Sequence, residues 1–260
     1  MRELFGMWRN TRMVVFTAMT ASLYAAILIP FKVLPIIPGV TELRPANAVP
    51  VVCSFLFGPA AAWGAAIGNI IGDFFGGFGP GDLFGFWGNF LYGFLPYRLW
   101  ELLTDRPPIP RRWSGWVLFG GVVAVASGAC ALVIGWGLNL LGFVPFRVLG
   151  NIVWLNNLLA SLLLAPLLLA VLYPRAERGR LVYRYVLVER RKPPAPVAWL
   201  GAVLVVVAVL AGMWLGNALS AGALVLPWTG SDAAAGTGAR AVGLGLLPVL
   251  LLLAIGIALL

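Results

Sequence analysis

The chain has 260 residues, of which 61% are hydrophobic and 10% are charged, with a mean hydropathy of +0.96 and a formal net charge of +9. Soluble domains carry about 25% charged residues, so this composition excludes an ordinary soluble protein. It predicts an all-α integral membrane protein, because helices satisfy every backbone polar group within the bilayer.

Apolar runs long enough to cross a bilayer follow one another along the chain. The first covers about residues 13–29, and since more apolar segments follow it, we predict a retained span rather than a signal peptide. The stretch 48–75 is interrupted by Gly58-Pro59, which predicts two shorter helices that meet at a bend. Further helices are predicted at about 83–103, 113–141, 149–173, 197–221 and 241–260, which gives eight helices, two of them short.

A basic segment, residues 175–196, divides the chain into two membrane parts. We predict a six-helix core over 1–174, a cytoplasmic linker over 175–196 and two additional transmembrane helices over 197–260. The middle of the linker, residues 181–188, suits either a short amphipathic piece at the membrane surface or a plain charged connector.

The distribution of lysine and arginine predicts the orientation. If the N-terminus is cytoplasmic and each helix crosses once, fourteen of the 18 basic residues lie on the cytoplasmic side. This is the positive-inside pattern, and it explains the net charge by contact with anionic lipid headgroups rather than with nucleic acid. The count of fourteen cytoplasmic basic residues holds only if the segment 48–75 crosses the bilayer twice. The basic residues expected outside are Lys32, Arg44, Arg147 and Arg240.

Polar side chains recur in residues 41–93, although the surrounding sequence is apolar and rich in glycine. A charge within the hydrocarbon costs about 2.5–3.5 kcal/mol, so this polarity indicates a site. Polar groups of the first outer loop and of three helices are predicted to converge on the outer half of the membrane. Such a pocket suits a small, flat organic molecule with polar edges. The candidate substrate-binding residues are Glu42, Arg44, Asn47, Asn69, Asp73, Asp82, Asn89, Asn151, Trp154 and Asn157.

Several of these residues have structural alternatives that the sequence leaves open. Asp82 follows GFGPG and is equally suited to cap its helix. Asn69 and Asn89 suit hydrogen bonds between helices, which contribute about 0.6 kcal/mol each in membranes. Arg44 suits an ion pair with Glu42, with a headgroup or with Asp73.

The sequence lacks the motifs for nucleotide binding, serine-type catalysis and metal binding. There is no G-x-x-x-x-G-K-[ST] phosphate loop, and without histidine neither a Ser-His-Asp set nor a His/Cys metal cluster can form. Cys53 and Cys130 lie in apolar runs and are expected to be buried hydrophobic side chains. We therefore predict no catalytic residue, no metal and no cofactor.

Three segments carry a family resemblance: LRPANAVPVV, LFGPAAAWGAAIGNIIGDFFG and GPGDLFGFWGNFLYG. With the small-residue first helix before them, they resemble the substrate-binding S component of energy-coupling factor (ECF) transporters, nearest the branch that includes queuosine-precursor transporters. The resemblance covers about residues 12–173. The two helices of 197–260 lie outside that six-helix core and are expected to be an accessory pair.

The resemblance implies a function and partners. The chain would bind a small vitamin-like or nucleobase-like micronutrient from outside a prokaryotic cell membrane. It would work with a transmembrane scaffold subunit and two cytoplasmic ATPases. In that family the small-residue face of the first helix docks on the scaffold, and here that face is Ala18, Ser22 and Ala26; ordinary packing within the bundle is the alternative.

Two rival functions are open at this point. One is a stand-alone secondary carrier that uses Asp73 for coupling; inverted repeats would favour it, and the sequence shows none. The other is a non-transport membrane protein, either a lipid enzyme or an assembly factor. The lack of histidine disfavours an enzyme.

Overall fold

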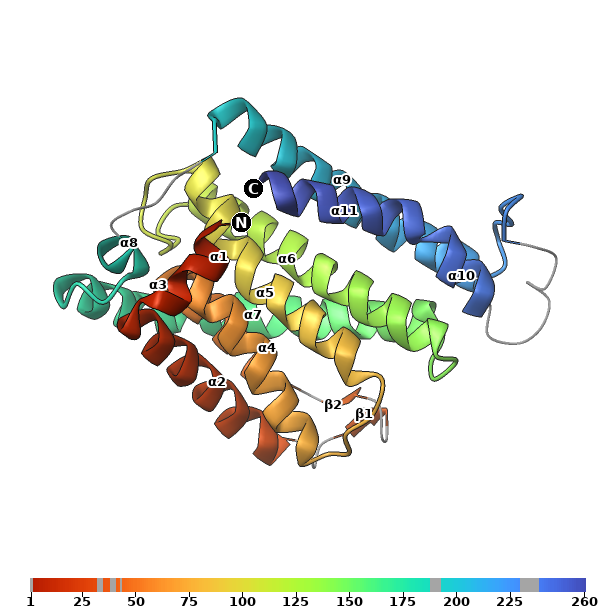
Figure 1. Ribbon diagram of the computed structural model, residues 1–260, viewed down its shortest axis with the longest axis horizontal. Coiled ribbons are helices and arrows are strands. Elements are labelled where there is room, and N and C mark those ends of the chain that lie inside the picture. The colour runs from red at the N-terminus through yellow and green to blue at the C-terminus, as the bar shows by residue number, and fades with distance from the viewer. Residues whose placement is uncertain (1, 32–34, 38–40, 43, 188–192, 230–238) are drawn as a thin grey trace.

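Helices form at each of the predicted apolar runs (Figure 1). The computed structural model describes residues 2–31, 35–37, 41–42, 44–187, 193–229 and 239–260. Within them the elements run in this order: α1 (Arg2–Gly6), η1 (Met7–Arg9), α2 (Thr11–Phe31), β1 (Pro35–Ile37), β2 (Thr41–Glu42), η2 (Pro45–Asn47), α3 (Ala48–Phe57), α4 (Pro59–Phe74), α5 (Asp82–Leu103), α6 (Trp113–Leu140), α7 (Phe146–Arg178), α8 (Tyr183–Val186), α9 (Ala195–Ser220), α10 (Ala239–Gly245) and α11 (Leu247–Leu259).

The all-α membrane class is confirmed. Five helical segments of the described chain are long and apolar enough to cross a bilayer, judged by length and composition. They are Thr11–Phe31, Trp113–Leu140, Phe146–Val186, Ala195–Ser220 and Ala239–Leu259. The other helices of the core are α5 and the two shorter helices α3 and α4. The sole sheet of the described residues is the small antiparallel β1–β2 pair.

The two ends of the bundle carry different elements. Both termini and α8 lie toward one end in Figure 1, and β1 and β2 lie toward the other. We call these the terminal end and the hairpin end. The turns between α4 and α5 and between α6 and α7 belong to the hairpin end, because these helices are antiparallel neighbours.

The predicted bend at Gly58-Pro59 is confirmed. α3 ends at Phe57, α4 begins at Pro59, and Gly58 between them has φ +56° and ψ −122°. Glycine adopts this backbone conformation readily, whereas residues with a Cβ do not. The site is also crowded, because a Cβ on Gly58 would lie 2.7 Å from the Tyr183 ring of α8.

A Gly58→Ala variant is therefore expected to lose about 1–3 kcal/mol of unfolding free energy, the usual cost of a strained backbone conformation. The measurement is an unfolding titration of the purified protein in mixed detergent micelles. Gly121→Ala is the matched control, since Gly121 lies in α6 with open space around its Cα. That variant should be neutral or slightly stabilising, and equal losses in both proteins would contradict the role of the bend.

The last predicted run, 241–260, corresponds to one apolar segment, Ala239–Leu259, which is divided at Leu246 into two helices. α10 ends at Gly245 and α11 begins at Leu247. Pro248 explains the interruption, because proline has no N–H to donate to the preceding turn and its ring crowds the carbonyl four residues back.

α2 packs on α4 through glycines spaced four apart. A Cβ on Gly64 would lie 2.8 Å from the Thr17 carbonyl, and one on Gly68 would lie 2.8 Å from the Ala21 carbonyl. Only glycine permits such an approach of two membrane helices. The small residues of α2 lie on two faces. Ala21 and Ala25 are buried on the side of this contact, whereas Ala18, Ser22 and Ala26 are exposed.

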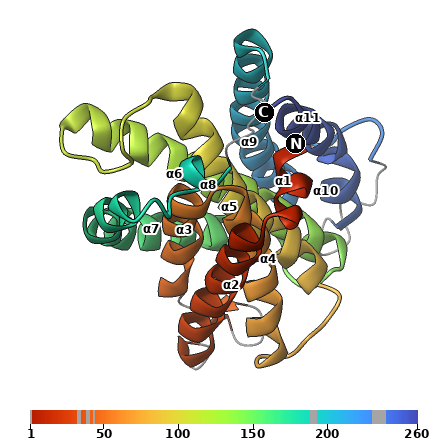
Figure 2. The ribbon, with the colours of Figure 1, turned by 60° about the vertical axis from the view of Figure 1, so that its left-hand side comes forward.

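The C-terminal helices pack on the core instead of standing apart from it. Figure 2 shows α9 and α11 side by side. A Cβ on Gly128 of α6 would lie 2.5 Å from Val209 of α9. The Trp136 indole of α6 donates a 3.0 Å hydrogen bond to the Gly243 carbonyl of α10. The interface thus combines close small-residue contacts with hydrogen bonds, among them this indole bond.

Candidate substrate-binding site

Three buried side chains from three elements meet around one hydroxyl. The Tyr24 hydroxyl of α2 lies 3.0 Å from Asn47 Oδ1 of η2 and 2.9 Å from Asn89 Oδ1 of α5. All three residues are almost inaccessible. Buried polar groups in a membrane protein require such partners, because the hydrocarbon offers none.

α7 completes this group. Asn47 Nδ2 donates to Asn157 Oδ1, and the Ser161 hydroxyl donates to the Asn47 carbonyl at 3.2 Å. Tyr92 of α5 donates to the Asn157 carbonyl at 2.9 Å and lies 2.6 Å from the Ser161 hydroxyl. We call the six residues the amide network: Tyr24, Asn47, Asn89, Tyr92, Asn157 and Ser161.

A charged group lies beside it toward the hairpin end. Arg44 Nη1 donates to Asn69 Oδ1 at 3.4 Å, and Asn69 Nδ2 donates to Asp73 Oδ2 at 2.6 Å. The Arg44 backbone N–H donates to Asn156 Oδ1 of α7 at 3.4 Å. We call Arg44, Asn69 and Asp73 the charged cluster. Asn69 thus bonds to Asp73 within its own helix and to Arg44, which precedes η2.

Local sequence explains how these side chains meet. Asn69 and Asp73 lie four apart and share a face of α4. Gly85 of α5 sits against them, since a Cβ there would come within 2.9 Å of Asn69 Nδ2. The Gly85 carbonyl also accepts a 2.9 Å bond from Asn89 Nδ2, which turns Asn89 Oδ1 toward Tyr24. α4 and α5 therefore approach closely at the point where the amide network and the charged cluster adjoin.

Three candidates make other contacts. Asp82 Oδ2 accepts a 2.6 Å bond from the Gly79 N–H, which closes the turn before α5. Asn151 exchanges hydrogen bonds with Asn217 of α9, at 2.7 and 3.2 Å. The Trp154 indole donates to the Ala124 carbonyl of α6 at 3.2 Å. The side chain of Glu42 lies outside the described residues, so its predicted role stays a prediction.

Three members of the amide network, Tyr24, Tyr92 and Ser161, are not among the candidates predicted from the sequence. Ser161 had a usable signal, because it follows Asn157 by four residues and therefore shares its helical face. Tyr24 had a weaker one: in an apolar helix its hydroxyl needs a buried partner, yet the sequence does not indicate which helix supplies it.

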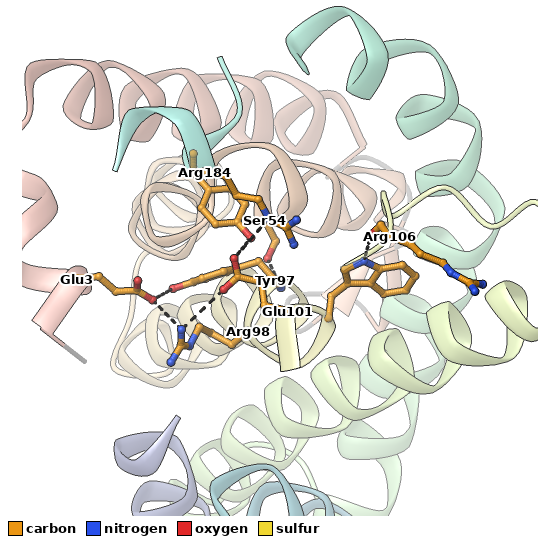
Figure 3. Close-up of polar contacts among 9 residues, drawn as sticks. Glu3, Ser54, Tyr97, Arg98, Glu101, Arg106 and Arg184 are labelled. Carbon is orange, nitrogen blue, oxygen red and sulfur yellow. Dashed lines mark hydrogen bonds and ion pairs between the residues drawn. The ribbon is translucent and has the colours of Figure 1, made fainter. Parts of the chain in front are cut away.

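A second polar group lies at the terminal end (Figure 3). Arg98 of α5 contacts Glu3 of α1 at 3.4 Å and Glu101 at 3.8 Å. Arg184 of α8 contacts Glu101 at 3.5 Å. Tyr97 donates to Glu3 at 2.9 Å, and Tyr183 donates to Glu101 at 2.7 Å. These six residues, which we call the terminal clasp, join α1, α5 and α8.

The terminal clasp is a structural device rather than a second binding site, because its charges neutralise one another. Arg98 is buried, and the Glu101 side chain is 5% exposed. The contacts attach α1 and α8 to the bundle. Each of these helices has too few residues to be stable alone. The clasp also holds Tyr183 against the bend at Gly58.

The amide network and charged cluster offer hydrogen-bond donors and acceptors of every kind, with one cation and one anion. Such groups can recognise a polar-edged molecule by its hydrogen bonds. Among the residues that the structure describes, no group of three or more His, Cys, Asp or Glu side chains is arranged to hold a metal ion. Cys53 and Cys130 are buried and unpaired there, as the sequence predicts.

A family model described as "QueT transporter" matches residues 14–174. No curated protein and no solved structure matches the chain. The matched segment runs from α2 into α7 and contains the whole amide network and the whole charged cluster. It confirms the resemblance noted in the sequence, and α9–α11 lie beyond its end.

Proposed function

Because the chain belongs to the QueT transporter family, we propose that it is the substrate-specific membrane subunit of an ECF-type ATP-driven importer. It binds a small vitamin-like or nucleobase-like micronutrient from outside the cell. The observation that carries this proposal is the convergence of Arg44, Asn69 and Asp73 with three asparagines within the family-matched segment.

In this proposal the ligand is held mainly by hydrogen bonds. Asn47, Asn89 and Asn157 bond to its polar edges, since an amide both donates and accepts. Arg44 donates to acceptor groups of the ligand, and Asp73 accepts from its donor groups. Both bonds are charge-assisted and therefore stronger than neutral ones. Arg44 and Asn47 border the segment between α2 and α3. Glu42, within that segment, is proposed to assist Arg44.

The remaining sequence candidates receive structural roles in this proposal. Asp82 stabilises the turn before α5, and Trp154 packs α7 on α6. Asn151 attaches α7 to the C-terminal helices. We propose the division into a core over 1–174, a linker over 175–196 and a membrane pair over 197–260, with that pair bracing α6 and α7.

The partners are proposed to be a transmembrane scaffold subunit and two cytoplasmic ATPases. The exposed small-residue row Ala18, Ser22 and Ala26 supports a close helix contact, because small side chains let a partner helix approach. The charge asymmetry of the sequence supports a cytoplasmic N-terminus in the cell membrane, with the terminal end of the bundle inside. ATP hydrolysis is assigned to the partners.

Uptake in cells tests the proposal. Cells that lack queuosine-precursor uptake would express the chain with its scaffold and ATPases, and uptake of labelled queuosine precursor would be measured. We expect uptake that requires all the subunits, and copurification of the chain with the scaffold that Ser22→Trp weakens. Native mass spectrometry of the purified chain would identify a retained ligand of another kind.

Two outcomes would count against the proposal. Uptake that survives deletion of every partner ATPase gene would favour a stand-alone carrier. A purified chain that retains no small molecule, binds no queuosine precursor and copurifies with no scaffold would exclude a substrate-specific subunit altogether.

A further inference from the structure

Tyr24 joins the two regions of α2 that matter for transport. Its side chain is fully buried and enters the amide network. Ser22 and Ala26 lie two residues away on either side and are exposed. Residues two apart point to nearly opposite faces of a helix, so one turn of α2 carries a network contact on one face and the proposed docking row on the other.

The Tyr24 hydroxyl faces two acceptors with one proton. Asn47 Nδ2 donates to Asn157, and Asn89 Nδ2 donates to the Gly85 carbonyl, so both amide oxygens are turned toward the tyrosine. A phenol has a single O–H to donate. It therefore satisfies Asn47 Oδ1 or Asn89 Oδ1 at a given moment, although both lie within 3.0 Å.

The two acceptors belong to different parts of the bundle. Asn47 ends η2, immediately before α3, and Asn89 lies on α5. The two buried threonines of α2 donate within their own helix, Thr17 to the Met13 carbonyl and Thr20 to the Phe16 carbonyl. Among the hydrogen bonds of the described residues, Tyr24 thus supplies the side-chain link from α2 to the candidate site.

We propose that Tyr24 is a positioning residue that couples ligand occupancy to the position of α2, a role that rests on the transport function proposed for the chain. A ligand N–H or O–H that bonds to one of the two amide oxygens leaves Tyr24 the other. The shared hydroxyl contact then becomes a single fixed one, which sets the position of α2 relative to η2 and α5. The docking row on the opposite face of α2 moves with it.

The experiment measures the position of α2 with two spin labels, on Leu23→Cys of α2 and Leu155→Cys of α7. Both positions are exposed, whereas Cys53 and Cys130 are buried and should remain unlabelled. Addition of a queuosine precursor is expected to shift or narrow the distance distribution, with a displacement of about 1–2 Å, the usual size of helix shifts. Binding is measured in parallel by titration calorimetry.

Tyr24→Phe is expected to abolish the ligand-dependent shift while affinity stays within about tenfold, since one hydrogen bond contributes about 0.5–1.5 kcal/mol. Tyr92→Phe is the matched control: this tyrosine is equally buried in the amide network but lies on α5. It should lower affinity yet preserve the shift. Asn89→Ala, which removes the α5 acceptor and keeps the tyrosine, should also reduce the shift and provides the test if Tyr24→Phe does not fold.

The outcomes separate the two proposals. A Tyr24→Phe protein that binds and shifts like the parent overturns the positioning role and leaves the transport function standing. A parent chain that binds no queuosine precursor and retains no other small molecule overturns the transport function, and the role of Tyr24 with it.

Discussion

Replacing Asn47 with leucine is expected to weaken binding of a queuosine precursor by about 30- to 100-fold. Asn47 bonds to Tyr24 and Asn157 through its side chain and to Ser161 through its carbonyl. Leucine has a similar volume but no polar side-chain atom, so Asn157 Oδ1 loses its donor, Tyr24 keeps only Asn89, and a ligand loses the amide. The Ser161 bond to the backbone carbonyl remains. Each group left unsatisfied costs about 1–3 kcal/mol, and 1.4 kcal/mol corresponds to a tenfold change in affinity. Titration calorimetry on the purified protein measures the effect.

Asn217→Leu is the matched control for this substitution. It also removes an asparagine from a helix junction of the same bundle, and it breaks the amide pair with Asn151. Because that pair joins α9 to α7, affinity should change by less than about threefold, and the loss should appear in stability, at about 0.6–1.7 kcal/mol. Equal losses of affinity in the two variants would show that Asn47 acts through general stability.

Arg98→Ala is expected to lower the unfolding free energy by about 3–5 kcal/mol, the usual effect of removing one partner of a buried ion pair. Arg98 stands between Glu3 and Glu101, and its loss leaves two carboxylates facing each other with less compensation. Unfolding titrations in mixed micelles measure the change. α1 should detach first, because Glu3 is the acid by which the clasp holds it.

Two further variants make this prediction specific. Arg112→Ala removes an exposed arginine at the same end and should change stability by no more than about 0.5 kcal/mol. Adding Glu3→Gln to Arg98→Ala removes one uncompensated charge and should restore part of the loss. A double variant as unstable as the sum of its single changes would contradict a charge-based origin.

Much of the architecture was predictable because membrane helices leave strong local signals. Runs of apolar residues located the spans to within a few residues, and Gly58-Pro59 predicted the bend because both residues act on the local backbone. α1 was not predicted. Its five residues contain no periodic signal, and it is held by Glu3 through contacts to Tyr97 and Arg98 nearly one hundred residues away.

The candidate site was predictable in composition more than in geometry. The bond between Asn69 and Asp73 follows from a spacing of four on one helix, which is a local property of the sequence. Asn151 and Asn157 were equal candidates in the sequence. In the structure Asn151 bonds to Asn217 of α9, whereas Asn157 bonds to Asn47. Which face of α7 meets which neighbour is decided by packing between helices, and small-residue contacts such as Gly128 with Val209 set that packing.

The amide pair of Asn151 and Asn217 has a consequence for biosynthesis. The two residues are 66 positions apart, so α7 emerges from the ribosome before its partner on α9. During that interval the Asn151 amide has its local bond to the Arg147 carbonyl but not its exchange with Asn217, and α6 and α7 present to lipid the faces that α9 and α10 later cover. The contacts of α6 and α7 are therefore complete only after residues beyond the family-matched segment have been inserted. A chain that terminates prematurely in this region would leave these helix faces exposed to lipid.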